Sequence, residues 1–60
     1  SSSDEGKKIA EALIKTYPGD PYDVIDKHCA NPCRSLHPTK TSPSRKTCRK
    51  QCEDEVFILA

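Results

Sequence analysis

Four cysteines, arranged as two identical pairs, constrain this 60-residue chain more than any other feature. They are Cys29, Cys33, Cys48 and Cys52, so each pair has the spacing C-x3-C and fourteen residues separate the pairs. Residues i and i+4 are neighbours on one face of an α-helix, whereas they lie about 13 Å apart along a β-strand. The pattern therefore predicts two helices, each with two cysteines on a single face.

Four cysteines allow three disulfide connectivities, and the helical interpretation favours one of them. In an antiparallel helical hairpin the outer cysteines face each other and so do the inner ones, which predicts Cys29–Cys52 and Cys33–Cys48. A bridge within one helical turn would be strained, and the crossed pairing suits parallel helices, which a short connection does not easily join. Each bridge closes a loop of roughly 16 to 24 residues and would contribute about 3 kcal/mol in a chain-entropy model, less for the nested one.

The same cysteines, together with His28 and His37, are alternatively potential zinc ligands. Structural zinc sites usually use C-x2-C pairs, whereas the spacer here is three residues long and the flanking segments have helical patterns. We therefore expect no metal, no cofactor and two disulfides, formed in an oxidising and extracellular compartment. No stretch has the pattern of a signal peptide, so we expect a secreted form to have lost its leader.

Length and composition limit the core that this chain can bury. Only 33% of the residues are apolar and 32% are charged, and a chain of this size buries about 60% of its unfolded surface. Such a chain has no room for a catalytic cleft, and no apolar run approaches the roughly 20 residues of a membrane-spanning helix. His28 and Cys29 are adjacent in sequence and would not face each other on a helix. We expect one small domain over residues 1–60, monomeric and without enzyme activity.

Capping residues and apolar periodicity predict a first helix over residues 3–17. Ser2 is its expected N-cap, and Glu5, three residues later, completes a capping box. Apolar residues then recur at helical spacing until Pro18-Gly19 ends the segment. The members of the apolar face are Ile9, Ala10, Leu13, Ile14 and Tyr17.

A second helix is predicted over residues 20–33, with Asp20 as its N-cap. Pro32 lies between the two cysteines of this segment and removes one backbone hydrogen bond. The helix is therefore expected either to kink at this proline or to end near Asn31. Residues 34–42, which contain a proline and several Ser and Thr, are typical of a loop.

A third helix is predicted over residues 43–57, because Ser42-Pro43 has the pattern of an N-cap followed by proline. Its cysteine face continues into an apolar end, residues 56–60, which would promote aggregation if exposed. The apolar face of the first helix is the expected cover. The fold class expected is all-α: a disulfide-stapled antiparallel helical hairpin with an additional N-terminal helix, three short helices in all.

The charges are sorted along the chain, although the net charge is only +1. Residues 34–50 contain six bases and no acid, whereas acids gather at residues 20–26 and 53–55. An antiparallel hairpin would place these groups at opposite ends, so we expect one basic and one acidic end. The basic residues, which are the candidates for partner binding, are Arg34, Lys40, Arg45, Lys46, Arg49 and Lys50.

A basic surface of this kind predicts an acidic partner. The stretch has no interleaved aromatic residues and no base-reading motif, so we expect no binding of nucleic acid. An acidic channel vestibule or an anionic membrane surface fits better. Solubility alone is an equally simple reason for so charged a surface, and that alternative stays open.

At Cys29, Cys33, Cys48 and Cys52, the chain resembles the disulfide-stabilised helical hairpins called alpha-hairpinins. That family includes plant antimicrobial and protease-inhibitor peptides and scorpion potassium-channel toxins of the hefutoxin type. The resemblance covers residues 20–58 and implies a secreted, cysteine-rich, toxin-like or host-directed venom peptide. Its implied partner is a membrane protein such as a potassium channel, with protease inhibition or antimicrobial defence as alternatives.

The resemblance also implies which residues would act. Channel-blocking members present a basic residue with an aromatic one nearby, which implies Lys46 or Lys50 with Tyr22 or Phe57. Inhibitory members expose a base in the loop between the cysteine pairs, where Arg34 and Lys40 are the possible matches. The twin C-x3-C pattern is similar, in addition, to that of the small translocase chaperones of the mitochondrial intermembrane space, whose flanking helices are longer on both sides. This second resemblance implies a small chaperone of that compartment as a less favoured alternative.

Overall fold

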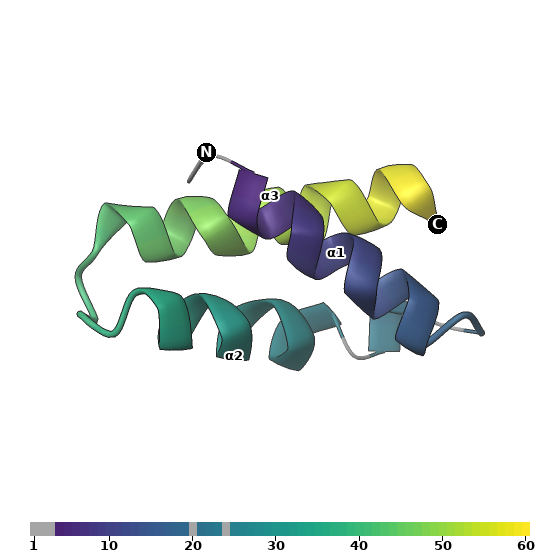
Figure 1. Cartoon of the computed structure of the whole chain (residues 1–60), viewed down its shortest axis with the longest axis horizontal. Coiled ribbons are helices and arrows are strands. Elements are labelled where there is room, and N and C mark those ends of the chain that lie inside the picture. Colours follow the sequence, from purple (N-terminus) through teal and green to yellow (C-terminus); the bar gives the residue numbers. More distant parts are fainter. Residues whose placement is uncertain (1–3, 20, 24) are drawn as a thin grey trace.

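The computed structural model describes residues 4–19, 21–23 and 25–60, and every regular element within these ranges is helical (Figure 1). The elements are α1 (Glu5–Thr16), the short 3-10 helix η2 (Pro21–Asp23), α2 (Ile25–Leu36) and α3 (Pro43–Leu59). Helices α2 and α3 run antiparallel, and α1 crosses them obliquely with its N-terminal end beside α3 (Figure 1). The predicted all-α class and its three main helices are confirmed.

The helix boundaries differ from the prediction by a few residues. The last turn of α1 is closed by the Tyr17 amide, which donates to the Leu13 carbonyl at 2.9 Å. The predicted N-caps of the first two helices, Ser2 and Asp20, lie outside the described residues. The second helix begins later than predicted, because residues 21–23 form η2 and α2 starts only afterwards.

Pro32 does not end the second helix. Helix α2 continues through this proline to Leu36, so the expected end near Asn31 is wrong, and residues 34–36, predicted as loop, are helical. A proline within a helix removes one hydrogen bond and costs about 3 kcal/mol when nothing opposes it. Here the helix is tied to α3 by one disulfide on each side of the proline, which favours continued helical geometry.

The core of the protein is built around the disulfides. Cys29–Cys52 and Cys33–Cys48 join α2 to α3 with Cα–Cα distances of 5.7 and 5.8 Å, which confirms the nested pairing. All four cysteines are buried. Helix α1 completes the core, whose central cluster is Ala10, Leu13, Cys29, Cys52 and Val56.

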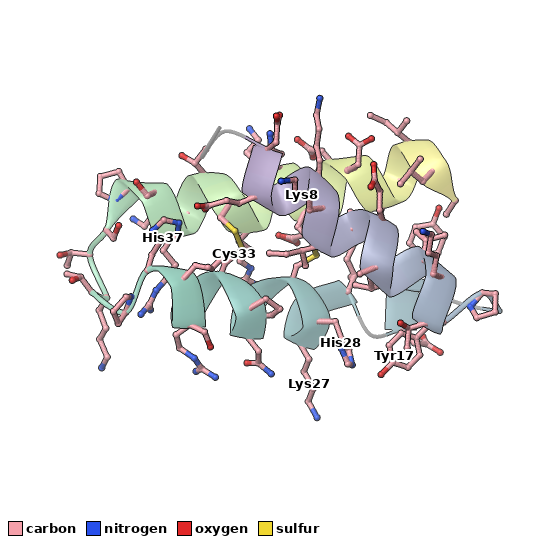
Figure 2. All side chains as sticks on the ribbon, in the orientation of Figure 1. Lys8, Tyr17, Lys27, His28, Cys33 and His37 are labelled. Atoms are coloured by element: carbon pink, nitrogen blue, oxygen red, sulfur yellow. A yellow bond between two sulfur atoms is a disulfide. The ribbon has the colours of Figure 1, made fainter. Side chains whose placement is uncertain are left out.

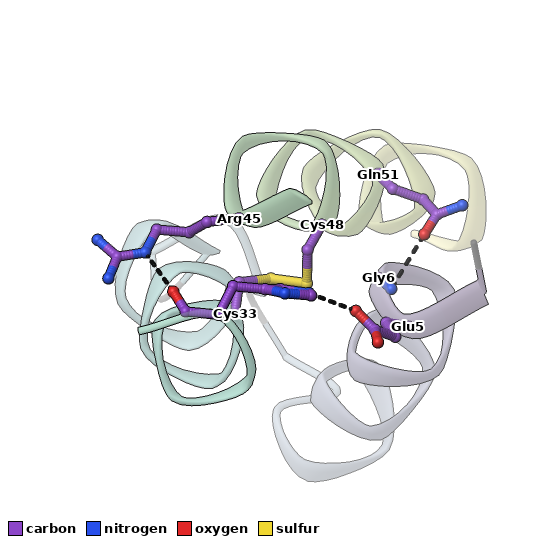
Figure 3. Close-up of polar contacts among 7 residues, drawn as sticks. Glu5, Gly6, Cys33, Arg45, Cys48 and Gln51 are labelled. Atoms are coloured by element: carbon purple, nitrogen blue, oxygen red, sulfur yellow. Dashed lines mark hydrogen bonds and ion pairs between the residues drawn. A yellow bond between two sulfur atoms is a disulfide. The ribbon is translucent and has the colours of Figure 1, made fainter. Parts of the chain in front are cut away.

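Helix α1 approaches α3 closely at Gly6. A Cβ atom at this position would lie 2.6 Å from the Cys48 carbonyl oxygen and 2.8 Å from the Cys52 amide nitrogen. The Gly6 amide also donates a hydrogen bond to Gln51 Oε1 at 3.0 Å (Figure 3). The crossing of the two helices therefore requires a residue without a side chain.

The apolar C-terminal end of α3 is only partly covered. Val56 is fully buried, whereas Phe57, Ile58 and Leu59 are 64%, 74% and 45% exposed. The expectation that the first helix covers this segment is right for Val56 and wrong for residues 57–60, which are exposed. Successive helical residues point about 100° apart, so a helix that packs against one side of α3 leaves the other sides open.

Candidate functional site

The hairpin separates the basic and the acidic segments in space. Residues 34–50 surround the turn between α2 and α3, and residues 53–55 lie near the C-terminal end of α3 (Figure 1). Asp23 and Asp26 precede or begin α2, at the same end as the C-terminus. Four of the six candidate bases thus lie at or near the turn end of the hairpin, whereas Arg49 and Lys50 lie in the middle of α3, and the six do not share one environment.

Arg45 holds the turn together. Its Nε donates to the His37 carbonyl at 2.9 Å (Figure 3). Its Nη2 donates to the Pro38 carbonyl at 2.7 Å. These carbonyls follow the last residue of α2, where the helix leaves acceptors without intrahelical partners. Arg45, predicted as a partner-binding residue, is therefore engaged within the molecule.

Two further candidate bases pair on their own helices. Arg49 Nε lies 3.4 Å from Glu53 Oε2, one turn further along α3. Arg34, which lies in α2, donates to Asn31 Oδ1 at 2.7 Å. Exposed pairs of this kind contribute little free energy, typically below about 1 kcal/mol. Both arginines are accessible, but a partner would have to compete with these contacts.

Lys40, Lys46 and Lys50 are exposed and form no ion pair within the part of the chain that the structure describes. Lys40 lies in the turn, whereas Lys46 and Lys50 lie one helical turn apart on α3. The helical periodicity directs both α3 lysines away from its cysteine face. They form a pair of neighbouring ammonium groups on a helix that two disulfides hold in place.

The two aromatic candidates lie together, toward the acidic end. The rings of Tyr22 and Phe57 are in contact, with centroids 5.2 Å apart and planes inclined by 35°. Phe57 follows Lys50 by seven residues and Lys46 by eleven, which places it on the same side of α3. The rise of the helix sets the ring about 10 Å from Lys50 and about 16 Å from Lys46 along the axis.

The basic end contains one contact that the sequence analysis missed. His37 Nε2 donates a hydrogen bond to Glu5 Oε2 at 2.7 Å, which ties the turn to the first residue of α1 (Figure 3). The two residues are 32 positions apart, and the sequence pattern assigned Glu5 to a capping box. No local pattern indicates such a pair. Its consequence is that one acid lies beside the basic turn, on the wall of a hollow of about 270 Å³.

His28 has a packing role. Its ring lies 4.7 Å from that of Tyr17, centroid to centroid, and joins α1 to α2 (Figure 2). The cysteine next to it is bonded in a disulfide, as are the other three. The zinc alternative requires thiolates, and these cysteines offer none.

We expect Arg45→Ala to lower the free energy of unfolding by about 1–2 kcal/mol, because it removes two hydrogen bonds from a charged donor. Chemical denaturation with the disulfides intact measures this change. Lys46→Ala removes the same charge one residue further along and should change stability by less than about 0.5 kcal/mol. Equal effects of the two substitutions would contradict the assigned role of Arg45.

The fold and the disulfides define a class: a small, all-helical, disulfide-stapled hairpin with an added N-terminal helix. Protein-family models, curated proteins and solved structures were compared with this chain, and none of them matches it. None of the described helices has the length and apolar character needed to cross a membrane. The paired cysteines fit an oxidising compartment such as the extracellular space.

Proposed function

We propose that this protein is a secreted, toxin-like helical peptide that blocks a cation channel of the potassium type through Lys46 and Lys50. The observation that supports this most is the exposure of these two lysines, side by side on α3, without an ion pair among the described residues. An ammonium group is a compact cation on a flexible stem. Rings of carbonyl oxygens or carboxylates in the mouth of a cation channel attract such a group.

The charge order along α3 supports a role beyond stability. Arg45 and Lys46 lie in the first turn of this helix, which contains no acid, and the acids at residues 53–55 lie toward its C-terminal end, so both groups oppose the helix dipole. Charges that disfavour the helix they belong to are an indication of function. An acidic vestibule would attract the basic end and repel the acidic one, so the separation of charge would orient the approaching molecule.

The disulfides favour binding by this surface as well. Both bridges end on α3, at Cys48 and Cys52, which alternate in sequence with Lys46 and Lys50 and lie on the opposite face of the helix. A helix whose backbone is already fixed loses little further backbone freedom on binding. The scaffold would therefore present the lysines without a large backbone ordering cost.

Protease inhibition has less support from the geometry. Proteases act on exposed loops, where the backbone is free of regular hydrogen bonds. Arg34 lies inside α2, so Lys40 is the one of the two candidate loop bases that lies in the turn. Incubation with trypsin tests this alternative: stoichiometric inhibition would favour it, and cleavage without loss of trypsin activity would argue against it.

Lys46→Ala and Lys50→Ala test the channel proposal on a panel of expressed potassium channels. We expect at least one of them to raise the half-blocking concentration about tenfold or more, as for residues at the centre of an interface. Far-UV circular dichroism should stay unchanged, because both side chains are exposed.

The matched controls are Lys15→Ala on α1 and Lys27→Ala on α2, which remove the same charge from exposed positions elsewhere. Their potency should stay within about twofold of the unchanged protein. Full potency in both α3 variants, or no block of any channel by the unchanged protein, would contradict the proposal.

A further inference from the structure

The last turns of α3 consist of an acidic ring followed by an apolar ring. The acids are Glu53, Asp54 and Glu55, and the apolar residues are Phe57, Ile58 and Leu59. Each apolar residue follows an acid by four positions and therefore lies one helical turn beyond it. Polarity here changes along the helix axis instead of around it. A neighbouring helix packs along one side of α3, so it cannot bury this ring.

Tyr22 enlarges this apolar group of side chains. Its aromatic ring lies 5.2 Å from that of Phe57, centroid to centroid, and the residue is itself 45% exposed. An open hollow of about 310 Å³ lies between Tyr22 and Leu59, with Ile14 and Tyr17 on its wall. We call the four exposed side chains the apolar tip: Tyr22, Phe57, Ile58 and Leu59.

We propose that the apolar tip docks on a zwitterionic lipid bilayer and enters it to the depth of the headgroups. Exposed apolar surface of this kind marks contact with a membrane or a protein. Aromatic side chains are enriched at the boundary between hydrocarbon and water. The charges around the tip then decide among the possible occupants.

Acidic residues lie next to the tip, and we call them the acidic collar. Those at 53–55 lie one turn below it on α3, where Glu53 pairs with Arg49 at 3.4 Å. Asp23 and Asp26 follow Tyr22 by one and four residues and are exposed. A second copy placed tip to tip would bring these acids together, and an anionic bilayer would repel them. A zwitterionic bilayer has no net charge, and its outermost quaternary ammonium groups attract carboxylates and aromatic faces.

The acidic collar sets the depth of docking. Its carboxylates on α3 lie one helical turn from the tip and would be costly in the hydrocarbon core, so the tip stays in the hydrated headgroup region. With α3 standing on the tip, Lys46 is held about 16 Å above Phe57. The docking itself does not depend on the channel block proposed above.

Sedimentation with phosphatidylcholine vesicles tests the proposal. The unchanged protein should bind, and 0.5 M salt should leave the partition coefficient within about twofold, because apolar burial is not screened. Phe57→Ser and Ile58→Ser should each lower the partition coefficient about tenfold. Ile58 is the more exposed of the two, so its variant keeps the test valid if Phe57→Ser disturbs the contact with Tyr22.

Leu36→Ser is the matched control. Leu36 is 52% exposed and lies at the end of α2, beside the turn and far along the hairpin from the tip. Its replacement should leave binding within about twofold. Replacing half of the phosphatidylcholine by phosphatidylglycerol should weaken binding of the unchanged protein several-fold, because the collar is acidic.

Three outcomes would overturn the inference. The first is no sedimentation with phosphatidylcholine. The second is tighter, salt-sensitive binding to the anionic vesicles, which would show that the basic end docks instead. The third is self-association in lipid-free solution that Ile58→Ser abolishes, which would assign the tip to a second copy. A failed channel assay would affect none of these measurements, so the two proposals can fail separately.

Discussion

Gly6→Ala should destabilise the protein by about 2–3 kcal/mol, although the same change in an unpacked helix would stabilise it by up to about 1 kcal/mol. The reason is the crossing with α3, where the added Cβ would lie 2.6 Å from the Cys48 carbonyl oxygen and 2.7 Å from Gln51 Cβ. The neighbouring atoms include backbone of a helix tied by disulfides, so they cannot move aside. Helix α1 must instead lift away, which exposes Ala10 and Leu13.

Gly19→Ala is the matched control for this prediction. Nothing lies within 4 Å of a Cβ atom at Gly19, and no described glycine has a positive φ. This change should therefore be neutral or stabilise by a few tenths of a kcal/mol through the unfolded chain. Urea unfolding measures the free energy of unfolding of both variants. Trypsin should cleave after Lys7, Lys8 and Lys15 faster in Gly6→Ala than in the unchanged protein. A more stable Gly6→Ala protein would contradict the docking of α1.

The second large effect concerns the disulfides, which should contribute unequally. Cys33→Ala with Cys48→Ala should lower the free energy of unfolding by less than about 3 kcal/mol, because the loop of 15-residue separation that it opens is nested within the one closed by Cys29–Cys52. Removal of the Cys29–Cys52 bridge, with a separation of 23, should cost more. Its sulfurs belong to the central cluster with Leu13 and Val56, so a cavity adds to the lost cross-link.

Thermal unfolding followed by circular dichroism distinguishes the two double variants. A domain of this size has only a few kcal/mol of stability, so the variant without Cys29–Cys52 should be largely unfolded at 25 °C. The variant without Cys33–Cys48 should retain a measurable but lowered transition. Full reduction of the unchanged protein should abolish cooperative unfolding. A reduced chain that melts at the same temperature would show that packing, and not the cross-links, holds the fold.

The cysteine spacing made the hairpin predictable, because positions i and i+4 share one helical face regardless of what surrounds them. Local turn chemistry was equally informative at Ser42-Pro43, where α3 begins as expected. The same local rules failed at Pro32. These rules assume a helix that has no tertiary contacts, whereas α2 is joined to α3 by a disulfide on each side of Pro32.

The candidate site was predictable in composition and less so in geometry. Six bases were predicted from the sequence to bind a partner, and the structure shows three of them engaged by neighbours: Arg34, Arg45 and Arg49. The lysines at 46 and 50 are the two that share a helix face without such contacts among the described residues. Hydrogen bonds to backbone carbonyls depend on where a turn places them, which a pattern of charges does not contain.

The sequence by itself determined the helical class, the nested bridges and the separation of basic from acidic segments, because each depends on periodicity and order along one chain. Only the tertiary structure decided how α1 docks, through Gly6 against α3 and Glu5 against His37. The tertiary structure alone also decided that Phe57, Ile58 and Leu59 stay exposed. The physical reason is that these contacts join residues distant in sequence, and their energies depend on close packing in three dimensions.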